Sequence, residues 1–302
     1  MPALVALADV VATALAEDLG EGWVVDDDLT AAATVPATAT ATARFVPRQP
    51  GVVAGLGAVV ATYALVDPST TVTLHAADGD PAVPGRAVAT VSGRARAVLV
   101  GERTALNLLT HLSGIATATR RLVDAVDGAC AIRDTRKTLP GLRALEKAAV
   151  VAGGGANHRM SLVDELLVKD NHVAAAGGMR QAVTAALAAA GGRPVQVEVD
   201  SLDQLDVVLA AGAERVLLDN FSLADTREGV ARCRATGRTV FVEASGGITG
   251  ERIDEVAACG VDAIAVGALT HSAGALDIGL DIDLDPDPPL HPDPHLHPGG
   301  DA

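Results

Sequence analysis

From residue 130 onward, short apolar segments alternate with alanine-rich stretches, and this alternation constrains the fold more than any other feature of the sequence. The apolar segments are rich in Val, Ile and Leu and occupy residues 130–134, 165–170, 195–200, 215–220, 240–245 and 263–267. Successive strand–helix units of this kind build a parallel sheet. Six units favour a closed or nearly closed α/β barrel. An open, doubly wound sheet is the alternative, although no Gly-x-Gly-x-x-Gly turn follows the first strand.

The amino-acid composition fits such a sheet and argues against several classes of protein. Hydrophobic residues make up 49% of the 302 residues but only five residues are aromatic, so the core must consist of Ala, Val, Leu and Ile. The formal net charge of −15 disfavours a nucleic-acid-binding or membrane-surface protein. Three isolated cysteines indicate a reducing cytoplasm, and the first 20 residues predict an amphipathic helix rather than a signal peptide.

The chain before residue 130 has a different pattern. Residues 40–56, 71–85 and 86–93 alternate apolar with polar residues between Pro and Gly turns, which predicts strands with one buried face. Residues 98–126 have apolar positions at helical spacing, and we expect Ser113-Gly114 to bend or interrupt this helix. The last 20 residues are rich in Pro, Asp and His, which predicts a disordered tail.

Charged and polar residues stand at the carboxyl end of almost every strand in the repeat. In a βα barrel these ends converge on one face, where enzymes of this architecture place their active sites. A whole ring of charges beside buried strands needs partners or a ligand. The residues at these ends are Arg133 and Asp134, Lys169 and Asp170, Glu198 and Asp200, Asp219 and Asn220, Glu243 and Ser245, and Gly267.

Cations gather around the first two strands of the repeat. Arg133 ends the first strand and Arg136 and Lys137 follow it, His158 and Arg159 follow the glycine run at 153–155, and Lys169 ends the second strand. Arginine binds carboxylate or phosphate through two parallel hydrogen bonds, and lysine adds a point charge. Since Asp134 is the only nearby acid, this cluster predicts an anion site rather than a set of surface salt bridges.

Two further groups of residues complete the predicted site. Glu198 and Asp219 end successive strands, and carboxylates beside an anion site predict Mg²⁺ bridging protein and substrate phosphates. Pairing of these acids with Lys137 or Lys169 is the structural alternative, and the two roles can coexist. The loops after the last two strands predict a phosphate site made of backbone N–H groups, at Ser245, Gly246, Gly247, Gly267 and Ala268.

The residues alone therefore predict a ligand with several anionic groups, including a terminal phosphate, bound together with Mg²⁺. The overall acidity does not oppose this, because residues 94–172 hold 12 basic and 8 acidic residues, a local balance of +4. Neither a Ser-His-Asp constellation nor a reactive cysteine is evident. The reaction itself is not identified by these patterns.

Over residues 15 to 282 the chain resembles the quinolinate phosphoribosyltransferase family of NAD biosynthesis. Seven segments occur in the order typical of that family, which makes the resemblance highly specific. They are ERTALNLLTHLSGIAT (102–117), DTRKTLPGLRALEKAAV (134–150), GGGANHRMSLVDELLVKDNH (153–172), VEVDS (197–201), LLDN (217–220), EASGGI (243–248) and VGALTHSA (266–273).

The resemblance implies an α/β protein of two domains. Residues 1–112 would form an open-faced α/β sandwich that includes the start of the linking helix, and residues 113–273 an incomplete, TIM-like α/β barrel. Residues 274–282 would return as a strand to the first domain, leaving 283–302 as the tail. The family forms dimers with shared active sites, so Arg103 would be contributed by the partner subunit.

The implied reaction joins quinolinate to phosphoribosyl pyrophosphate and yields nicotinate mononucleotide, pyrophosphate and CO₂. Quinolinate would be bound by Arg103, Arg136, His158 and Arg159, with Lys137 and Lys169 nearby. Glu198 and Asp219 would hold Mg²⁺ and the ribose or pyrophosphate, and the two loops with Ser245 and Gly267 the 5′-phosphate. The catalytic residues implied are Lys137, Lys169, Glu198 and Asp219.

Three alternatives remain open at this point. A related phosphoribosyltransferase could use nicotinate or another pyridine carboxylate, or the chain could resemble family-like proteins associated with molybdenum uptake. Lys169 could instead be the Schiff-base lysine of a barrel aldolase, which would need a desolvated site. A non-catalytic protein that binds phosphorylated sugars would leave the acid pair unexplained.

Overall fold

The protein is described by a computed structural model that covers residues 7–248 and 250–285. These residues form two compact units. One contains residues 7–111 and 276–285, and the other contains residues 112–248 and 250–275. The division falls within the long helix α4, Ala95–Val126, and again after Ala275.

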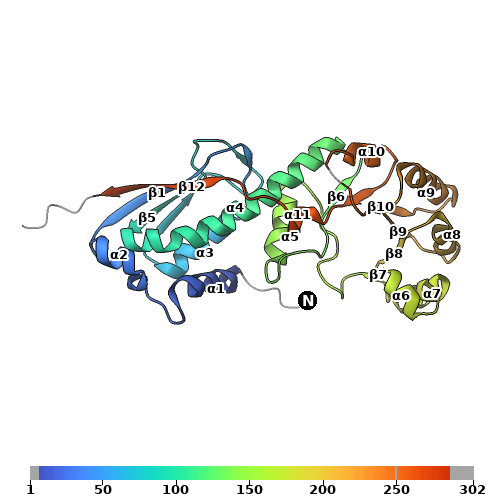
Figure 1. Cartoon of the computed structure of the whole chain (residues 1–302), viewed down its shortest axis with the longest axis horizontal. Helices are drawn as coiled ribbons and strands as arrows, with labels where there is room; N and C mark the ends of the chain where they lie inside the picture. The colour runs from blue at the N-terminus through green and yellow to red at the C-terminus, as the bar shows by residue number, and fades with distance from the viewer. Residues whose placement is uncertain (1–6, 249, 286–302) are drawn as a thin grey trace, which may run out of the picture. The chain divides into compact units, whose positions relative to one another are not determined.

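The first unit is built around an antiparallel sheet (Figure 1). Four strands occur in the order β12-β1-β5-β3, so the last strand of the chain pairs with the first. A separate short pair joins β2 to β4. The elements are α1 Leu7–Leu19, η1 Val25–Asp27, α2 Leu29–Thr34, β1 Thr40–Pro47, β2 Gly51–Val52, α3 Leu56–Val66, β3 Thr71–Leu74, β4 Pro81–Ala82, β5 Ala89–Arg94 and β12 Ile278–Asp285.

Two of the few aromatic side chains form the centre of this unit. Phe45 and Tyr63 are fully buried, with their rings edge to face and 6.3 Å between centroids. The Tyr63 hydroxyl donates to the Val98 carbonyl at 3.1 Å. Gly101 on α4 leaves room for this ring, since a Cβ there would lie 2.6 Å from Tyr63 Cε1. The remaining core consists of Ala, Val, Leu and Ile, as the composition predicts.

The second unit contains a parallel sheet of six strands in the order β6-β11-β10-β9-β8-β7. Helices α7 to α10 follow one another along one side of this sheet (Figure 1). The predicted α/β class with an incomplete barrel is confirmed, because β6 and β7 end the sheet without pairing with each other. The elements are β6 Ala131–Arg133, α5 Arg143–Ala152, β7 Leu166–Val168, α6 Asp170–Ala175, α7 Met179–Ala189, β8 Val195–Val199, α8 Leu202–Ala210, β9 Arg215–Asp219, α9 Leu223–Ala235, β10 Phe241–Ser245, α10 Ile253–Ala257, β11 Ala263–Ala265 and α11 Ala268–His271.

The segment after α5 extends the sheet beside β6. The Ala156 N–H donates to the Ile132 carbonyl at 2.8 Å, and the Asp134 N–H donates to the Ala156 carbonyl at 3.2 Å. This is a parallel bridge between Arg133 and Ala156. The contact brings the residues that follow Ala156 to the carboxyl end of β6.

The expected interruption of the long helix is wrong, because α4 runs without a break from Ala95 to Val126. Gly114 has another purpose. A Cβ at this position would lie 2.1 Å from the Gly274 carbonyl oxygen, so the missing side chain allows the chain to pass close to the helix. Glycine in a helix can thus mark a close approach as well as a break.

The structure differs from the sequence expectations at two further places. The sequence pattern predicts no helix between residues 56 and 71, whereas α3 occupies Leu56–Val66. The predicted tail at 283–302 lies outside the described residues from 286 onward, and residues 283–285 belong to β12. Among the described residues, no helix is both long and apolar enough to cross a membrane.

Candidate functional site

A pocket of about 390 Å³ lies at the carboxyl ends of the parallel strands. Every lining residue belongs to the second unit and stands at or just after a strand, apart from the residues that follow the 153–155 glycine run. The lining consists of Thr135, Arg136, Lys137, His158, Arg159, Leu167, Lys169, Glu198, Leu217, Asp219, Ser245 and Ala265. This is the face on which βα barrels place their active sites.

Eight of the thirteen residues predicted from the sequence meet in this pocket. They come from segments as far apart as the loop after β6 and the end of β10. These eight are Arg136, Lys137, His158, Arg159, Lys169, Glu198, Asp219 and Ser245. Their convergence is what the parallel topology predicts, since the strands all end at the same face.

The other five predicted residues do not line the pocket. Gly246 and Gly247 directly follow Ser245, and both have positive φ, of 92° and 59°. Gly267 is the N-terminal flanking residue of α11, and Ala268 is the first residue of that helix. Arg103 is exposed on α4 and belongs to the first unit.

Glu198 and Asp219, the two residues predicted to hold Mg²⁺, both accept hydrogen bonds from neighbouring side chains. Lys169 Nζ lies 2.5 Å from Glu198 Oε2, so the structural alternative predicted for Glu198 is realised. Asp219 accepts a hydrogen bond of 2.7 Å from the side-chain amide of Asn220. Both acids still line the pocket, and Lys169 is 43% exposed, so this pair is open to a ligand.

Two guanidinium groups in the pocket form no ion pair with a carboxylate among the residues that the structure describes. Arg136 Nε is buried and has no hydrogen-bond partner. Arg159 donates to a backbone carbonyl, that of Glu165, at 3.1 Å. Both side chains line the same pocket, and burial, followed by the positive charge of Arg136, lowers the pKa of Arg159. Like charges held side by side with an unpaired donor form an anion-binding arrangement.

His158 is held as a neutral donor. Burial, followed by the charges of Arg133 and Lys147, lowers its pKa to about 3. The backbone N–H of Arg159 donates to His158 Nδ1 at 2.7 Å, so the ring proton is on Nε2. The predicted role of this residue, donation to an anion, is compatible with that tautomer.

The prediction that Arg133 belongs to the anion site is wrong, because its side chain does not line the pocket and lies in a buried layer together with Glu243. Arg133 donates to Glu243 Oε2 at 2.7 Å, and the Gln196 amide donates to the same oxygen at 2.8 Å. Glu243 is completely buried, and desolvation raises its pKa. Both Arg133 and Glu243 were recognised as strand-end charges. No signal in the sequence showed that they point to each other inside the barrel.

Asn220 forms hydrogen bonds both to Ser245, in the predicted phosphate site, and to Asp219, in the predicted metal site. Its backbone is left-handed, with φ of 57°, which is uncommon for a residue other than glycine. Its N–H donates to the Ser245 carbonyl at 2.9 Å, and its side chain reaches Asp219. A Cβ on Gly246 would lie 2.3 Å from Asn220 Oδ1, so the glycine allows this contact.

The donor set fits a magnesium ion only if the substrate supplies ligands. Among residues 7–248 and 250–285, no group of three or more His, Cys, Asp or Glu side chains is placed to hold a metal. Mg²⁺ is commonly held by one or two carboxylates together with substrate phosphates. Glu198 and Asp219 provide such a pair in the pocket, beside the cations that would receive those phosphates.

Comparison with known proteins agrees with this geometry along most of the chain. Residues 28–113 match the family model described as the N-terminal domain of quinolinate phosphoribosyl transferase, and residues 115–281 match its C-terminal domain. The structure also resembles that of NadC from Streptococcus pyogenes, with a TM-score of 0.85 and 35% identity, over 93% of this chain and 97% of that one.

Two curated relatives are similar over nearly their whole lengths. Nicotinate-nucleotide pyrophosphorylase [carboxylating] from Mycobacterium leprae is 50% identical over 92% of this chain and 97% of its own. A probable nicotinate-nucleotide pyrophosphorylase [carboxylating] from Bacillus subtilis is 42% identical over 89% of this chain and 90% of its own. With both domain models matched and the pocket in the expected place, the chain belongs to the quinolinate phosphoribosyltransferase family.

Proposed function

We propose that this protein transfers a phosphoribosyl group from phosphoribosyl pyrophosphate to quinolinate, with loss of CO₂, to give nicotinate mononucleotide and pyrophosphate. The observation that carries this proposal is the occurrence, in one pocket, of two guanidinium groups that form no ion pair within the described part of the chain and of two strand-end carboxylates. The relatives named above as carboxylating pyrophosphorylases support the same reaction.

The cationic side of the pocket fits quinolinate, a pyridine with two adjacent carboxylates. Arg136 and Arg159 would each bind a carboxylate through parallel hydrogen bonds, and neutral His158 would donate one more. Lys137 and Lys169 would lie next to the anionic groups of both substrates. Nicotinate has a single carboxylate and would leave one of the two half-buried guanidinium groups unpaired, at a cost in binding free energy.

The other side of the pocket fits the phosphosugar. Ser245 and the turn at Gly246-Gly247 would bind the 5′-phosphate through backbone N–H groups, together with Gly267 and Ala268. Glu198 and Asp219 would hold Mg²⁺, which, when bound, offsets the charge that develops on the departing diphosphate.

The chemistry follows from positioning. The ring nitrogen of quinolinate forms a bond to the anomeric carbon while the bond from that carbon to the diphosphate oxygen breaks. Holding both reactants at bonding distance lowers the barrier, and Lys137 and Lys169 stabilise the leaving charge. The pyridinium ring then accepts the electron pair released when the adjacent carboxylate leaves as CO₂, and the ring carbon takes up a proton. The transfer step needs no general base.

The same proposal includes a homodimer in which the partner subunit's Arg103 completes each pocket. Arg103 is exposed and is absent from the lining of its own chain's pocket. Mixing Arg103→Ala and Lys169→Ala proteins tests this arrangement, because exchanged subunits would regenerate one intact site per dimer. Subunits that demonstrably exchange without recovering activity would contradict a shared site. A cytoplasmic location is proposed as well, supported by three cysteines that are all free.

The decisive experiment mixes purified protein with Mg²⁺, phosphoribosyl pyrophosphate and ¹⁴C-carboxyl-labelled quinolinate. We expect labelled CO₂ and nicotinate mononucleotide in equal amounts, with neither formed when either substrate is omitted. Turnover of nicotinate but not of quinolinate would overturn the substrate assignment. Lys169→Ala protein is the control for contaminating activity.

A Schiff-base aldolase using Lys169 is not favoured by the geometry. An amine nucleophile of this kind is desolvated, whereas Lys169 is 43% exposed and paired with Glu198. Borohydride trapping with carbonyl substrates is the corresponding test. A substrate-dependent adduct on Lys169 would contradict the transferase proposal.

A further inference from the structure

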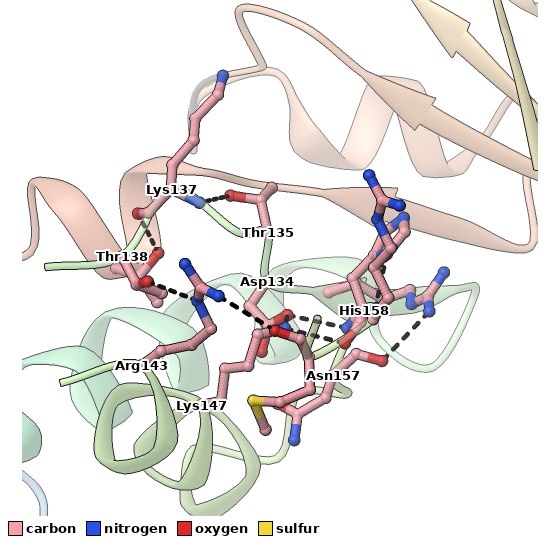
Figure 2. A network of polar contacts seen from close by, with 12 residues as sticks. Asp134, Thr135, Lys137, Thr138, Arg143, Lys147, Asn157 and His158 are labelled. Carbon is pink, nitrogen blue, oxygen red and sulfur yellow. Dashed lines mark hydrogen bonds and ion pairs between the residues drawn. The ribbon is translucent and has the colours of Figure 1, made fainter. Parts of the chain in front are cut away.

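Lys147 is the one lysine of the chain that lies outside the pocket, since Lys137 and Lys169 both line it. It projects from α5 and its side chain is completely buried. Its ammonium group forms an ion pair with Asp134 and donates to the His158 carbonyl at 2.8 Å. Figure 2 shows Lys147 reaching Asp134 with His158 beside them, whereas the Lys137 side chain extends away from this network.

Lys147 binds the backbone carbonyl of His158, and Asp134 binds the backbone N–H of the same residue. Asp134 Oδ1 accepts the backbone N–H of His158 at 2.8 Å. The Asn157 amide, in the orientation that satisfies both of its ends, donates to Asp134 Oδ2 at 2.5 Å and to the Lys147 carbonyl at 3.0 Å. The two members of one buried ion pair thus bind the N–H and the C=O of His158, so the pair fixes the orientation of the backbone at this residue.

Stability alone does not account for a pair of this kind. Removing two charges from water costs several kcal/mol per ion, and well-packed apolar residues of similar volume often give equal or greater stability. What apolar side chains cannot supply is directional bonding to a particular peptide group. Asp134 is also two residues before Arg136, and His158 is one residue before Arg159.

We propose that Lys147 and Asp134 are a positioning pair that sets the spacing of the Arg136 and Arg159 guanidinium groups and thereby selects a ligand with two adjacent carboxylates. This inference rests on the proposed use of quinolinate. The pair acts through the backbone of His158 and touches no substrate itself. Its loss should therefore weaken the binding of the dicarboxylate and leave the phosphosugar, which we place at the ends of β8 to β11, unaffected.

The test uses the full-length Lys147→Met protein. Calorimetry measures the Kd for quinolinate, and steady-state kinetics measures KM for each substrate. We expect the Kd for quinolinate to rise about ten- to a hundredfold, because this is the effect on affinity of losing one charge-assisted hydrogen bond to a displaced guanidinium group. KM for phosphoribosyl pyrophosphate should change less than about twofold. Val230→Ala, a buried change on α9 of the same unit, is the control that lowers Tm without changing either constant.

A double-mutant cycle with Arg159→Ala separates positioning from a general loss of stability. In the Arg159→Ala background, Lys147→Met should raise the Kd for quinolinate by less than about threefold, because the group being positioned is absent. An equal effect in both backgrounds, or equal shifts in KM for both substrates, would overturn the proposal. If Lys147→Met does not fold, Lys147→Met with Asp134→Asn removes the unpaired buried charge and is measured in the same way.

These outcomes are distinct from failure of the proposed function. Wild-type protein that binds quinolinate without turnover would contradict the reaction, while the Kd ratio would still decide the role of the pair. Wild-type protein that does not bind quinolinate would contradict both. A mutant Kd within about twofold of the wild-type value would contradict the positioning pair alone.

Discussion

The interiors of the two units differ in what they bury. Among the described residues of the first unit, the buried polar side chains are Thr62, Asp67 and Thr104, and the centre is the Phe45–Tyr63 pair. The second unit buries both members of two ion pairs, Lys147–Asp134 and Arg133–Glu243. Apolar packing determines the shape of an interior. Buried ion pairs also fix the orientation of the groups that they bind, but removing their charges from water costs free energy. Charged residues are buried directly beneath the candidate site, where direction matters.

Removing one buried charge should have the largest effect. Glu243→Ala leaves Arg133 and the Gln196 amide without their acceptor in a dry interior, and we expect a loss of about 3–5 kcal/mol in the free energy of unfolding. Phe45→Ala in the other unit should cost a similar amount by leaving a cavity. Calorimetry measures the stability of each variant. Only Glu243→Ala should also weaken quinolinate binding. If Phe45→Ala weakened binding equally, the buried charges of the second unit would have no special role in the site.

Breaking an ion pair in the pocket should lower activity, whereas breaking a surface ion pair in the first unit should change neither activity nor stability. Lys169→Ala breaks the pair with Glu198, and we expect kcat/KM to fall about 10²- to 10³-fold with little change in Tm. Arg44→Ala breaks the exposed pair with Asp283 in the first unit, and neither quantity should change. A loss of activity of less than about tenfold for Lys169→Ala would contradict its place in the site.

Acid should destabilise the second unit through His158. The folded-state pKa of about 3 lies below the unfolded value of about 6.5, so the unfolded chain binds a proton first as the pH falls. The contribution of neutral His158 is complete above pH 6.5 and is lost progressively down to about pH 3. The calorimetric Tm of the wild type should therefore fall more steeply between pH 6.5 and 4 than that of His158→Gln. Parallel curves would show that His158 is not buried as a neutral ring.

The smallest predicted effect isolates backbone strain at Asn220. Asn220→Ala places an alanine in a left-handed conformation and should cost about 1–2 kcal/mol more than Asn220→Gly, which tolerates that conformation. Both variants lose the amide bond to Asp219, so both should lose activity to the same extent. Urea unfolding and the CO₂ assay measure the two quantities. If Asn220→Ala were much less active than Asn220→Gly, backbone strain, rather than loss of the amide bond, would be the cause of the effect on Asp219.

Much of the second unit could be predicted from sequence, because local patterns identify both the positions of the strands and the residues at their carboxyl ends. The short Val-, Ile- and Leu-rich segments identified all six strands, and the position just after a strand identified eight lining residues. The sequence did not predict which strand-end residues would line the pocket and which would be buried beneath it. Glu243 and Ser245 lie two residues apart on β10 and so share a face, yet Ser245 lines the pocket and Glu243 lies buried below it.

Partner choice was not predictable either. The sequence indicated Asp134 as the acid nearest to Arg136 and Lys137, but its carboxylate is taken by Lys147, one helix later. That pairing depends on how α5 packs, which residue spacing does not encode. Gly114 illustrates the same limit, because the contact that requires a glycine comes from residue 274.

The bridge between β6 and the segment after α5 has a consequence for the order of folding. The bonds that hold His158 join residues 11 to 24 positions apart, whereas pairing of β6 with β11 joins Ala131 to Ala263, a separation of 132. Contacts between nearby residues close small loops and form early. We therefore expect the cationic side of the pocket to assemble on the ribosome well before residue 263 is synthesised, and to provide an edge on which the rest of the barrel is completed.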